Sequence, residues 1–270
     1  MLRLKSSEEI ALMRRAGSVV AEALAAMRDA IVPGVTTTLD LDEIAAEVLK
    51  RHGAKSAFLG YKPPFSHVAY KYNTCLSINE EVVHGVPSKK RVLHEGDIIG
   101  LDMGASIDGW YADAAITVPV GQINAAAKNL LTVTQEALMK GISQARPGNH
   151  MGDVSAAVQK HAERARYGVV RSLVGHGIGQ TPHEEPQVPN YGRLGRGILL
   201  KPGMTFCIEP MINVKTDEVD HVPGDEWTIV TLDGSLSAHF EHTIAVTEHG
   251  PEILTAGGLV GEKKQLYASA

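Results

Sequence analysis

The chain has 270 residues, 44% of them apolar and 21% charged, and a formal net charge of −5. These proportions indicate an ordinary globular protein of one or two domains with a sizeable core. The acidic balance provides no general basic field, so specific binding to nucleic acid is not expected.

Cysteine usage and hydropathy indicate where the protein works. The two cysteines, Cys75 and Cys207, provide no disulfide framework and fit a reducing compartment. No apolar run approaches the length that spans a membrane. The first fifteen residues lack the apolar core of a signal peptide. We therefore expect a cytoplasmic protein without a membrane partner.

The first half of the chain begins with two predicted helices. Ser6 and Glu9 have the spacing of a capping box, and apolar residues then recur at helical steps to about Ala30. Thr38 or Asp40 is expected to cap a second helix that runs through Lys50 and ends near Gly53. Residues 54–79 read as short strands with an irregular loop.

Residues 97–120 predict a β-hairpin that carries two aspartates. Apolar runs flank Ser106–Gly109, and Asp-Gly between such runs is a strong turn signal. A four-residue loop would set Asp102 directly opposite Asp113, with Cβ atoms roughly 5 Å apart. Carboxylates that close repel unless a cation or a proton intervenes, so a divalent metal is the obvious candidate. Two alternatives remain open: a two-residue loop, which would shift the register and separate the pair, and a solvated strand face.

The pattern then restarts. Residues 122–145 predict a helix, and Asp153 leads a shorter one through Ala162. Strand-like runs follow at 168–174, 204–214, 226–232 and 239–247. Because both halves run long helix, short helix, strands, we expect an α/β fold in a single domain over 1–250. Its halves would meet near residue 120, with a C-terminal tail over 251–270.

The second half supplies further metal-binding side chains. His176 lies among glycines, and His183 follows seven residues later. Glu209 and Glu241 lie within strand-like runs, which is unusual for glutamate unless something neutralises it, although an outward charge on an edge strand is the simpler alternative. The combined set favours a dinuclear Mn²⁺, Fe²⁺ or Co²⁺ site over a thiolate-rich zinc site; it comprises Asp102, Asp113, His176, Glu209 and Glu241. Two metals roughly 3.5 Å apart can share a bridging hydroxide and polarise a carbonyl, which indicates a metal hydrolase of open substrate.

Five segments that occur in the same order as in a known family make the predicted function more specific. The chain closely resembles the type I methionine aminopeptidases of the pita-bread metallohydrolase family, over nearly all of residues 3–250. The matching segments are SINEEVVHGVP (77–87), Asp102 with Asp113, GHGIGQTPHEEPQV (175–188), GMTFCIEPMIN (203–213) and LSAHFEHTIAVT (236–247). The resemblance implies a pseudo-twofold structure around an antiparallel sheet. It also implies removal of the initiator methionine from nascent chains when the second residue is small, by a monomer that meets the ribosome transiently.

The resemblance also implies residue roles. The five residues named above would bind two divalent metals, with Zn²⁺ or Ni²⁺ as further candidates, and Glu209 would transfer the proton of the bridging water. His84 would contact the substrate amine or the scissile nitrogen, and His183 the substrate carbonyl. A Na⁺ or K⁺ ion would be held by the backbone carbonyls of Asn79, Glu81 and Ser237.

The methionine pocket is where the sequence departs from the family pattern. The matching positions are Phe58, Tyr61, Phe65, Cys75 and Trp227. Phe58 stands where bacterial relatives often have a smaller cysteine, Pro182 stands where an aromatic residue is common, and the segment Lys62–Tyr72 is several residues longer.

Two alternative functions share these motifs. A proline-specific peptidase of the same superfamily would keep all five ligands, but such enzymes usually carry an additional N-terminal domain. A non-catalytic pita-bread binding module would typically lose ligands, whereas this chain retains all five and both histidines.

Overall fold

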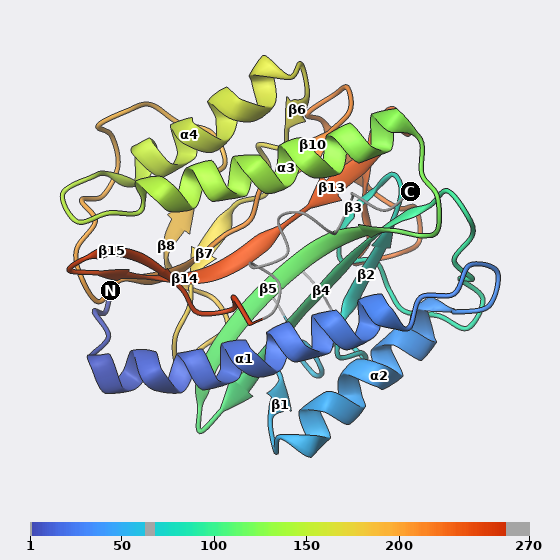
Figure 1. Cartoon of the computed structure of the whole chain (residues 1–270), viewed down its shortest axis with the longest axis horizontal. Helices are drawn as coiled ribbons and strands as arrows, with labels where there is room; N and C mark the ends of the chain where they lie inside the picture. Colours follow the sequence, from blue (N-terminus) through green and yellow to red (C-terminus); the bar gives the residue numbers. More distant parts are fainter. Residues whose placement is uncertain (1, 63–67, 258–270) are drawn as a thin grey trace.

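The computed structural model describes residues 2–62 and 68–257. Its helices form two pairs, α1 (Ser7–Asp29) with α2 (Thr38–Arg51) and α3 (Ala125–Gln144) with α4 (Met151–Arg164). The two pairs lie on either side of the central strands in Figure 1. Among the residues described, none of these helices combines the length and the apolarity that crossing a membrane requires.

The helices begin at polar caps. The predicted capping box of α1 is confirmed, since Ser6 Oγ accepts from the Glu9 N–H and the Glu9 carboxylate accepts from the Ser6 N–H. The predicted cap of α2 is wrong by a residue or more. Thr37 is the N-cap and has an extended backbone. Its side chain accepts from the N–H of Asp40, the third helical residue, and the Asp40 carboxylate accepts from the Thr37 N–H.

The main sheet is antiparallel in every pairing that the described residues make. Its order is β1-β4-β5-β14-β9-β7-β8, with β2 beside β4 and β15 beside β14. The strands of this sheet are β1 (Lys55–Ser56), β2 (Cys75–Ile78), β4 (Ile98–Ile107), β5 (Trp110–Pro119), β7 (Gly175–Gly177), β8 (Glu184–Val188), β9 (Thr205–Ile208), β14 (Glu241–Thr247) and β15 (Gly250–Ile253). The antiparallel sheet and the repeated helix pairs match the pita-bread architecture expected from the sequence.

Two smaller sheets flank the main one. The first contains β6 (Gly168–Val169), β10 (Met211–Asn213) and β13 (Ser237–His239), and the second β3 (Glu81–Val83), β11 (Val219–His221) and β12 (Ile229–Thr231). The predicted run 204–214 is therefore two strands in different sheets. The chain leaves the main sheet at Glu209-Pro210, where proline cannot donate a ladder hydrogen bond. The predicted run 168–174 is likewise too long, since its strand stops at Val169.

The predicted register of the β4–β5 hairpin is wrong. Ile107 pairs with Trp110, so the loop is the two-residue Asp108-Gly109 turn, and both of its residues have positive φ. Asp113 consequently faces Gly104 rather than Asp102. Because the register differs by two residues, both aspartates still point to the same face, as diagonal neighbours.

The two faces of the hairpin differ in what covers them. Leu101 and Met103 alternate with Asp102 along β4, are completely buried and join the core that contains Leu24 of α1. Helix α1 therefore packs on the face opposite the aspartates. This leaves the aspartate face free to form a site.

The segment expected as a tail begins with ordered structure. Residues 250–253 form β15 against β14, and the Leu254 N–H donates to the Thr243 carbonyl. The Leu254 carbonyl lies so close to α1 that a Cβ built on Gly17 would be 2.1 Å from its oxygen. Gly17 is thus required by the close approach of this segment.

We predict that Gly17→Ala destabilises the protein, although glycine to alanine within a helix normally stabilises by about 1 kcal/mol. The backbone shift that relieves the clash should lower the free energy of unfolding by about 1–3 kcal/mol, measured by urea denaturation. Ser18→Ala, on the exposed side of the same turn, should stay within about 0.5 kcal/mol of the wild type. A Gly17→Ala protein as stable as the wild type would contradict this packing.

Candidate metal centre and substrate cavity

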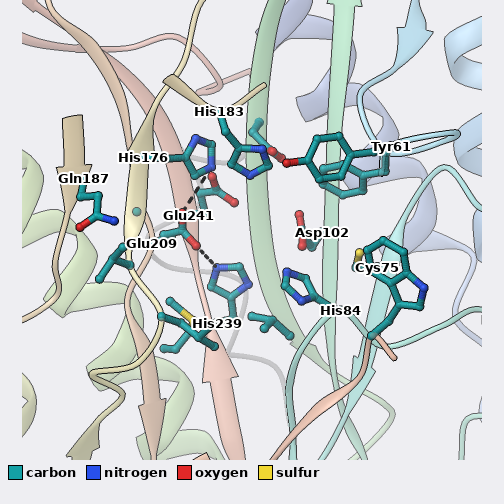
Figure 2. Close-up of a pocket in the computed structure, with 18 of the residues that line it drawn as sticks. Tyr61, Cys75, His84, Asp102, His176, His183, Gln187, Glu209, His239 and Glu241 are labelled. Atoms are coloured by element: carbon teal, nitrogen blue, oxygen red, sulfur yellow. Dashed lines mark ion pairs between the residues drawn. The ribbon is translucent and has the colours of Figure 1, made fainter. Parts of the chain in front are cut away.

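A cavity of about 670 Å³ opens on the aspartate face of the main sheet. It brings together most of the side chains singled out from the sequence: Phe58, Tyr61, Cys75, His84, Asp102, Asp113, His176, His183, Glu209, Trp227 and Glu241. These residues come from β2, β4, β5, β7 and β14 and from the connections around them. Figure 2 shows the labelled side chains converging on one space.

Carboxylates occupy one end of the cavity. Asp102, Asp113 and Glu241 each place an oxygen within 4.8 Å of the others. Thr243 fixes the backbone of Asp113 twice, since its hydroxyl accepts from the Asp113 N–H at 2.9 Å and donates to the Asp113 carbonyl at 2.8 Å. Glu209 completes the group from the break after β9, where Asn190 donates to its carbonyl oxygen.

Nothing in the described cavity wall neutralises these carboxylates. No lysine or arginine lines the described part of the cavity, and Asp113 Oδ1, Glu209 Oε1 and Glu241 Oε1 are buried without a hydrogen-bond partner. Burial, and then the neighbouring carboxylates, raise the pKa values of Asp102, Glu209 and Glu241 well above their usual range. Burial also raises the pKa of Asp113 to about 7. Such a cluster is stable when cations bind between its members.

His176 has a nitrogen ready for a metal. Its Nδ1 lies 3.0 Å from the Gly177 carbonyl, which only accepts, so Nδ1 carries the proton and Nε2 presents a lone pair. Nε2 lies 3.5 Å from Glu209 Oε1. Burial, followed by the nearby His183, lowers the pKa of His176 to about 3, so the ring is neutral at physiological pH.

The donor set fits divalent metal ions. Four carboxylates and a neutral imidazole are hard and borderline ligands, and Glu241 belongs to both groups of side chains that are close enough to share an ion. The buried carboxylate oxygens that have no hydrogen-bond partner also point to a cation at this place.

Two histidines border the carboxylates. The His183 ring centre lies 4.3 Å from that of His176 and 5.2 Å from that of Tyr61. The loop that carries His183 is held by Glu184, whose carboxylate accepts from Lys5 Nζ at 2.6 Å and from the Gln180 N–H at 2.8 Å. This loop is therefore fixed to the segment before α1.

His84 lies on the opposite side of the cavity in a left-handed backbone conformation, with φ of 60°. That conformation costs a non-glycine residue about 1–3 kcal/mol and is typical of functional positions. Burial, followed by His183 and His221, lowers the pKa of His84 to about 4. Since burial also lowers the pKa of His183, both rings are neutral hydrogen-bonding groups.

The other end of the cavity is aromatic. Trp227 packs edge-on against Tyr70, with ring centres 4.9 Å apart, and Tyr70 is buried beside Cys75. Tyr70 was not predicted from the sequence, because it lies in the longer segment for which the resemblance gave no pattern. The predicted pocket residue Phe65 lies outside the described residues.

His239 and Cys207 are further residues that the sequence analysis missed. His239 Nε2 lies 3.8 Å from Glu209 Oε2, so Glu209 stands between His176 and His239 in Figure 2. Each missed residue precedes a predicted ligand by two positions: His239 precedes Glu241, and Cys207 precedes Glu209. For Cys207, the period of two within the predicted run 204–214 was a signal that could have found it, whereas His239 and Glu241 lie in different strands, β13 and β14.

The three residues expected at a monovalent cation site lie together but outside the cavity wall. The Ser237 N–H donates to the Asn79 carbonyl at 2.9 Å. The Glu81 side chain forms an ion pair with Arg91 and accepts from the Ile78 N–H.

Comparison with known proteins identifies the family. The model of metallopeptidase family M24 matches residues 11–248. The chain is 48% identical over 255 residues to a methionine aminopeptidase of Clostridium acetobutylicum and 45% identical over 255 residues to methionine aminopeptidase 1 of Bacillus subtilis. Each match covers 94% of this chain and 99% of the relative. The chain belongs to metallopeptidase family M24, on its methionine aminopeptidase branch.

Solved structures agree with this assignment. The crystal structure of methionine aminopeptidase from Thermotoga maritima superposes with a TM-score of 0.90 at 47% identity, over 94% of this chain and 99% of that one. A prolidase from Pyrococcus horikoshii shares the fold, with a TM-score of 0.73 at 24% identity, over 93% of this chain but 63% of that one. The chain is therefore an M24 metallopeptidase with the pita-bread fold of the family.

We predict that Asp113→Asn stabilises the metal-free protein at high pH. The folded protein keeps a proton on Asp113 up to pH about 7, whereas the unfolded chain loses it near pH 4. The carboxyl therefore lowers the free energy of unfolding increasingly as pH rises from about 4 to about 7.

Urea denaturation of both metal-free proteins at pH 5 and pH 8 measures this effect. The advantage of Asp113→Asn should be larger at pH 8, where it should exceed about 1 kcal/mol. The buried histidines are common to both proteins and cancel. Added Mn²⁺ should reverse the order by stabilising the wild type more. A difference independent of pH would mean that Asp113 is ionised in the metal-free fold.

Proposed function

We propose that this protein removes the N-terminal methionine of peptides and nascent chains when the second residue is small. The single observation that carries the proposal is the cavity, which joins a buried carboxylate cluster to an aromatic end and is also lined by two neutral histidines. Because Cys75 of the aromatic end pairs directly with Asp102 of the cluster, the two parts adjoin, and the cavity can hold an apolar side chain while the next peptide bond lies at the carboxylates. The names of the relatives support methionine as that side chain.

The aromatic end would bind the methionine side chain. Tyr61, Tyr70 and Trp227 offer ring faces and edges, and Cys75 is buried at the side. A flexible, polarisable thioether packs well against aromatic edges and sulfur. A charged side chain would lose its hydration here without gaining a partner.

The metal ligands would be Asp102, Asp113, His176, Glu209 and Glu241. Divalent ions held there would supply Lewis acidity for the substrate carbonyl and a water nucleophile that is active at neutral pH. Mn²⁺, Fe²⁺ and Co²⁺ suit the carboxylate-rich donor set, and Zn²⁺ or Ni²⁺ remain candidates. Backbone carbonyls of Asn79, Glu81 and Ser237 would hold a Na⁺ or K⁺ ion beside the cavity.

Glu209 would move the proton from the attacking water to the leaving nitrogen. Its carboxylate lies between the rings of His176 and His239, with Oε1 3.5 Å from one and Oε2 3.8 Å from the other. Glu209 Oε1 has no hydrogen-bond partner, so this oxygen is available to accept and release a proton.

The two neutral histidines would orient the substrate. His183 would donate an N–H to the substrate carbonyl, whose oxygen gains negative charge in the transition state. His84 would contact the amine or the scissile nitrogen from the opposite wall. Substrates of this kind are new chains in the cytoplasm, so the protein would contact the ribosome transiently. It would act as a monomer.

Hydrolysis of X-Pro bonds is the competing activity, and the shared fold of the prolidases favours it. Those neighbours are 24% or less identical, and the chain spans under two thirds of their length. The methionine aminopeptidases match at almost full length. We therefore expect methionine specificity.

Comparing kcat/KM on four tripeptides tests the function. Met-Ala-Ser should be the best substrate, while Met-Lys-Ser and Leu-Ala-Ser should lose about 10–200-fold, because one mismatched group costs about 1–3 kcal/mol. Ala-Pro-Ser should be the poorest. If Ala-Pro-Ser is the best of the four, the protein is a proline-specific peptidase and the proposed function is wrong.

The role of His183 is tested separately. His183→Ala should lower kcat on Met-Ala-Ser by about 10²–10³-fold, because a donor to the developing oxyanion acts mainly in the transition state. KM should change much less. His183→Gln keeps an N–H donor and should recover part of the loss. An effect confined to KM would show that His183 only binds the ground state.

A further inference from the structure

A sulfur atom lies against the carboxylate cluster. Cys207 is in β9, two residues before Glu209, and is completely buried. Across the sheet its register partner is Thr243 of β14, which follows Glu241 by two residues. Cys207 therefore points to the same side of the sheet as the carboxylates.

Three different donor types converge at this point. Cys207 Sγ, a ring nitrogen of His176 and a carboxylate oxygen of Glu241 all lie within 4.8 Å of one another. Glu241 is 3% exposed, and its Oε1 has no hydrogen-bond partner. His176 presents the Nε2 lone pair, since Nδ1 donates to Gly177. A nitrogen, a sulfur and an oxygen donor form a set that zinc accepts.

The hydrogen bonds leave the sulfur lone pairs available. Cys207 Sγ lies 3.4 Å from Thr243 Oγ1. The single proton of the Thr243 hydroxyl is already donated to the Asp113 carbonyl, so in this contact the thiol is the donor. A metal can approach the sulfur without displacing a hydrogen bond to its lone pairs.

We propose that His176, Cys207 and Glu241 form a sulfur-containing site for a thiophilic divalent ion, Zn²⁺ above all. The inference rests on the proposed function and adds to it a sulfur donor beside two of the proposed ligands. When the ion binds, the S–H bond breaks, the proton leaves to solvent and a sulfur lone pair forms the bond to the metal. No oxidation state changes.

Two consequences follow for metal choice. A thiolate ligand favours Zn²⁺ or Co²⁺ over Mn²⁺, which prefers oxygen donors. Because His176 and Glu241 also belong to the proposed dinuclear set, an ion in the sulfur site competes with that set. The donors of a bound zinc ion lie about 3.5 Å apart, so side-chain torsions must draw the three atoms together by about an ångström.

Cobalt spectroscopy on the full-length, metal-free protein tests the site. One equivalent of Co²⁺ should produce a sulfur-to-cobalt charge-transfer band in the near ultraviolet. The chain has only two cysteines, so Cys75→Ser is a matched control that should keep the band. Cys207→Ser should lose it, and its affinity for Zn²⁺, measured by competition with a chelating dye, should fall at least about 10-fold.

The wild-type protein alone can overturn the proposal, whether or not Cys207→Ser folds. X-ray absorption at one equivalent of Zn²⁺ should show a sulfur scatterer at about 2.3 Å. A shell of nitrogen and oxygen only, or a cobalt band that follows Cys75 instead, would show that Cys207 is not a ligand. Peptide hydrolysis is measured separately. Methionine release without the charge-transfer band would show that the sulfur site is wrong and the proposed function right. The band without methionine release under any metal would show that the proposed function is wrong.

Discussion

The constraint on which this structure depends is the burial of Asp102, Asp113 and Glu241 beside the partly exposed Glu209, in one cavity wall without a lysine or arginine among its described lining residues. Each ion alone would lose several kcal/mol of hydration, and together they repel. The fold accepts this arrangement because strands of a single antiparallel sheet, held by a core on its opposite face, cannot move apart individually. The neutral imidazole of His176 adds a donor without adding to the charge. Metal binding and folding are therefore linked, because cations would replace the protons that the raised pKa values keep on these carboxyls in the metal-free protein.

The same sheet explains why the cavity has two ends of different character. Period-two alternation places the acidic side chains of β4, β5 and β14 on the face that α1 does not cover. The aromatic end comes from connections rather than from strands, since Tyr61, Tyr70 and Trp227 all lie outside strands. A rigid metal-binding sheet with loop-borne specificity lets substrate preference vary while the ligand positions stay fixed. A methionine aminopeptidase and a prolidase share this fold, which is consistent with this division.

Much of the fold could be predicted from the sequence, because caps, helical periodicity and turn signals are local, and the candidate ligands named from the sequence do lie together in one cavity. The hairpin shows the limit of local reasoning. Asp108 has the positive φ that a two-residue turn needs, and the choice between two and four loop residues depends on pairing energy along ten residues of each strand. The error did not separate the aspartates, because a two-residue shift preserves the face. His239 and Tyr70 were missed for a different reason: their positions depend on how separate segments meet, and the sequence carries no local signal for that.

Cys207 and His239 indicate how a chain could adjust a shared centre while keeping the five ligands that the family resemblance implies. Both precede a proposed ligand by two residues, so a change at either position alters what surrounds the metals while the ligands stay in place. An imidazole beside Glu209 affects the orientation of the proton-transfer group, whereas a thiol beside Glu241 affects the softness of the donor set. Because both positions are buried, solvent does not screen the electrostatic effect of either residue. With the proposed ligand set, metal preference in this protein would therefore depend on Cys207 and His239 as well as on the five proposed ligands.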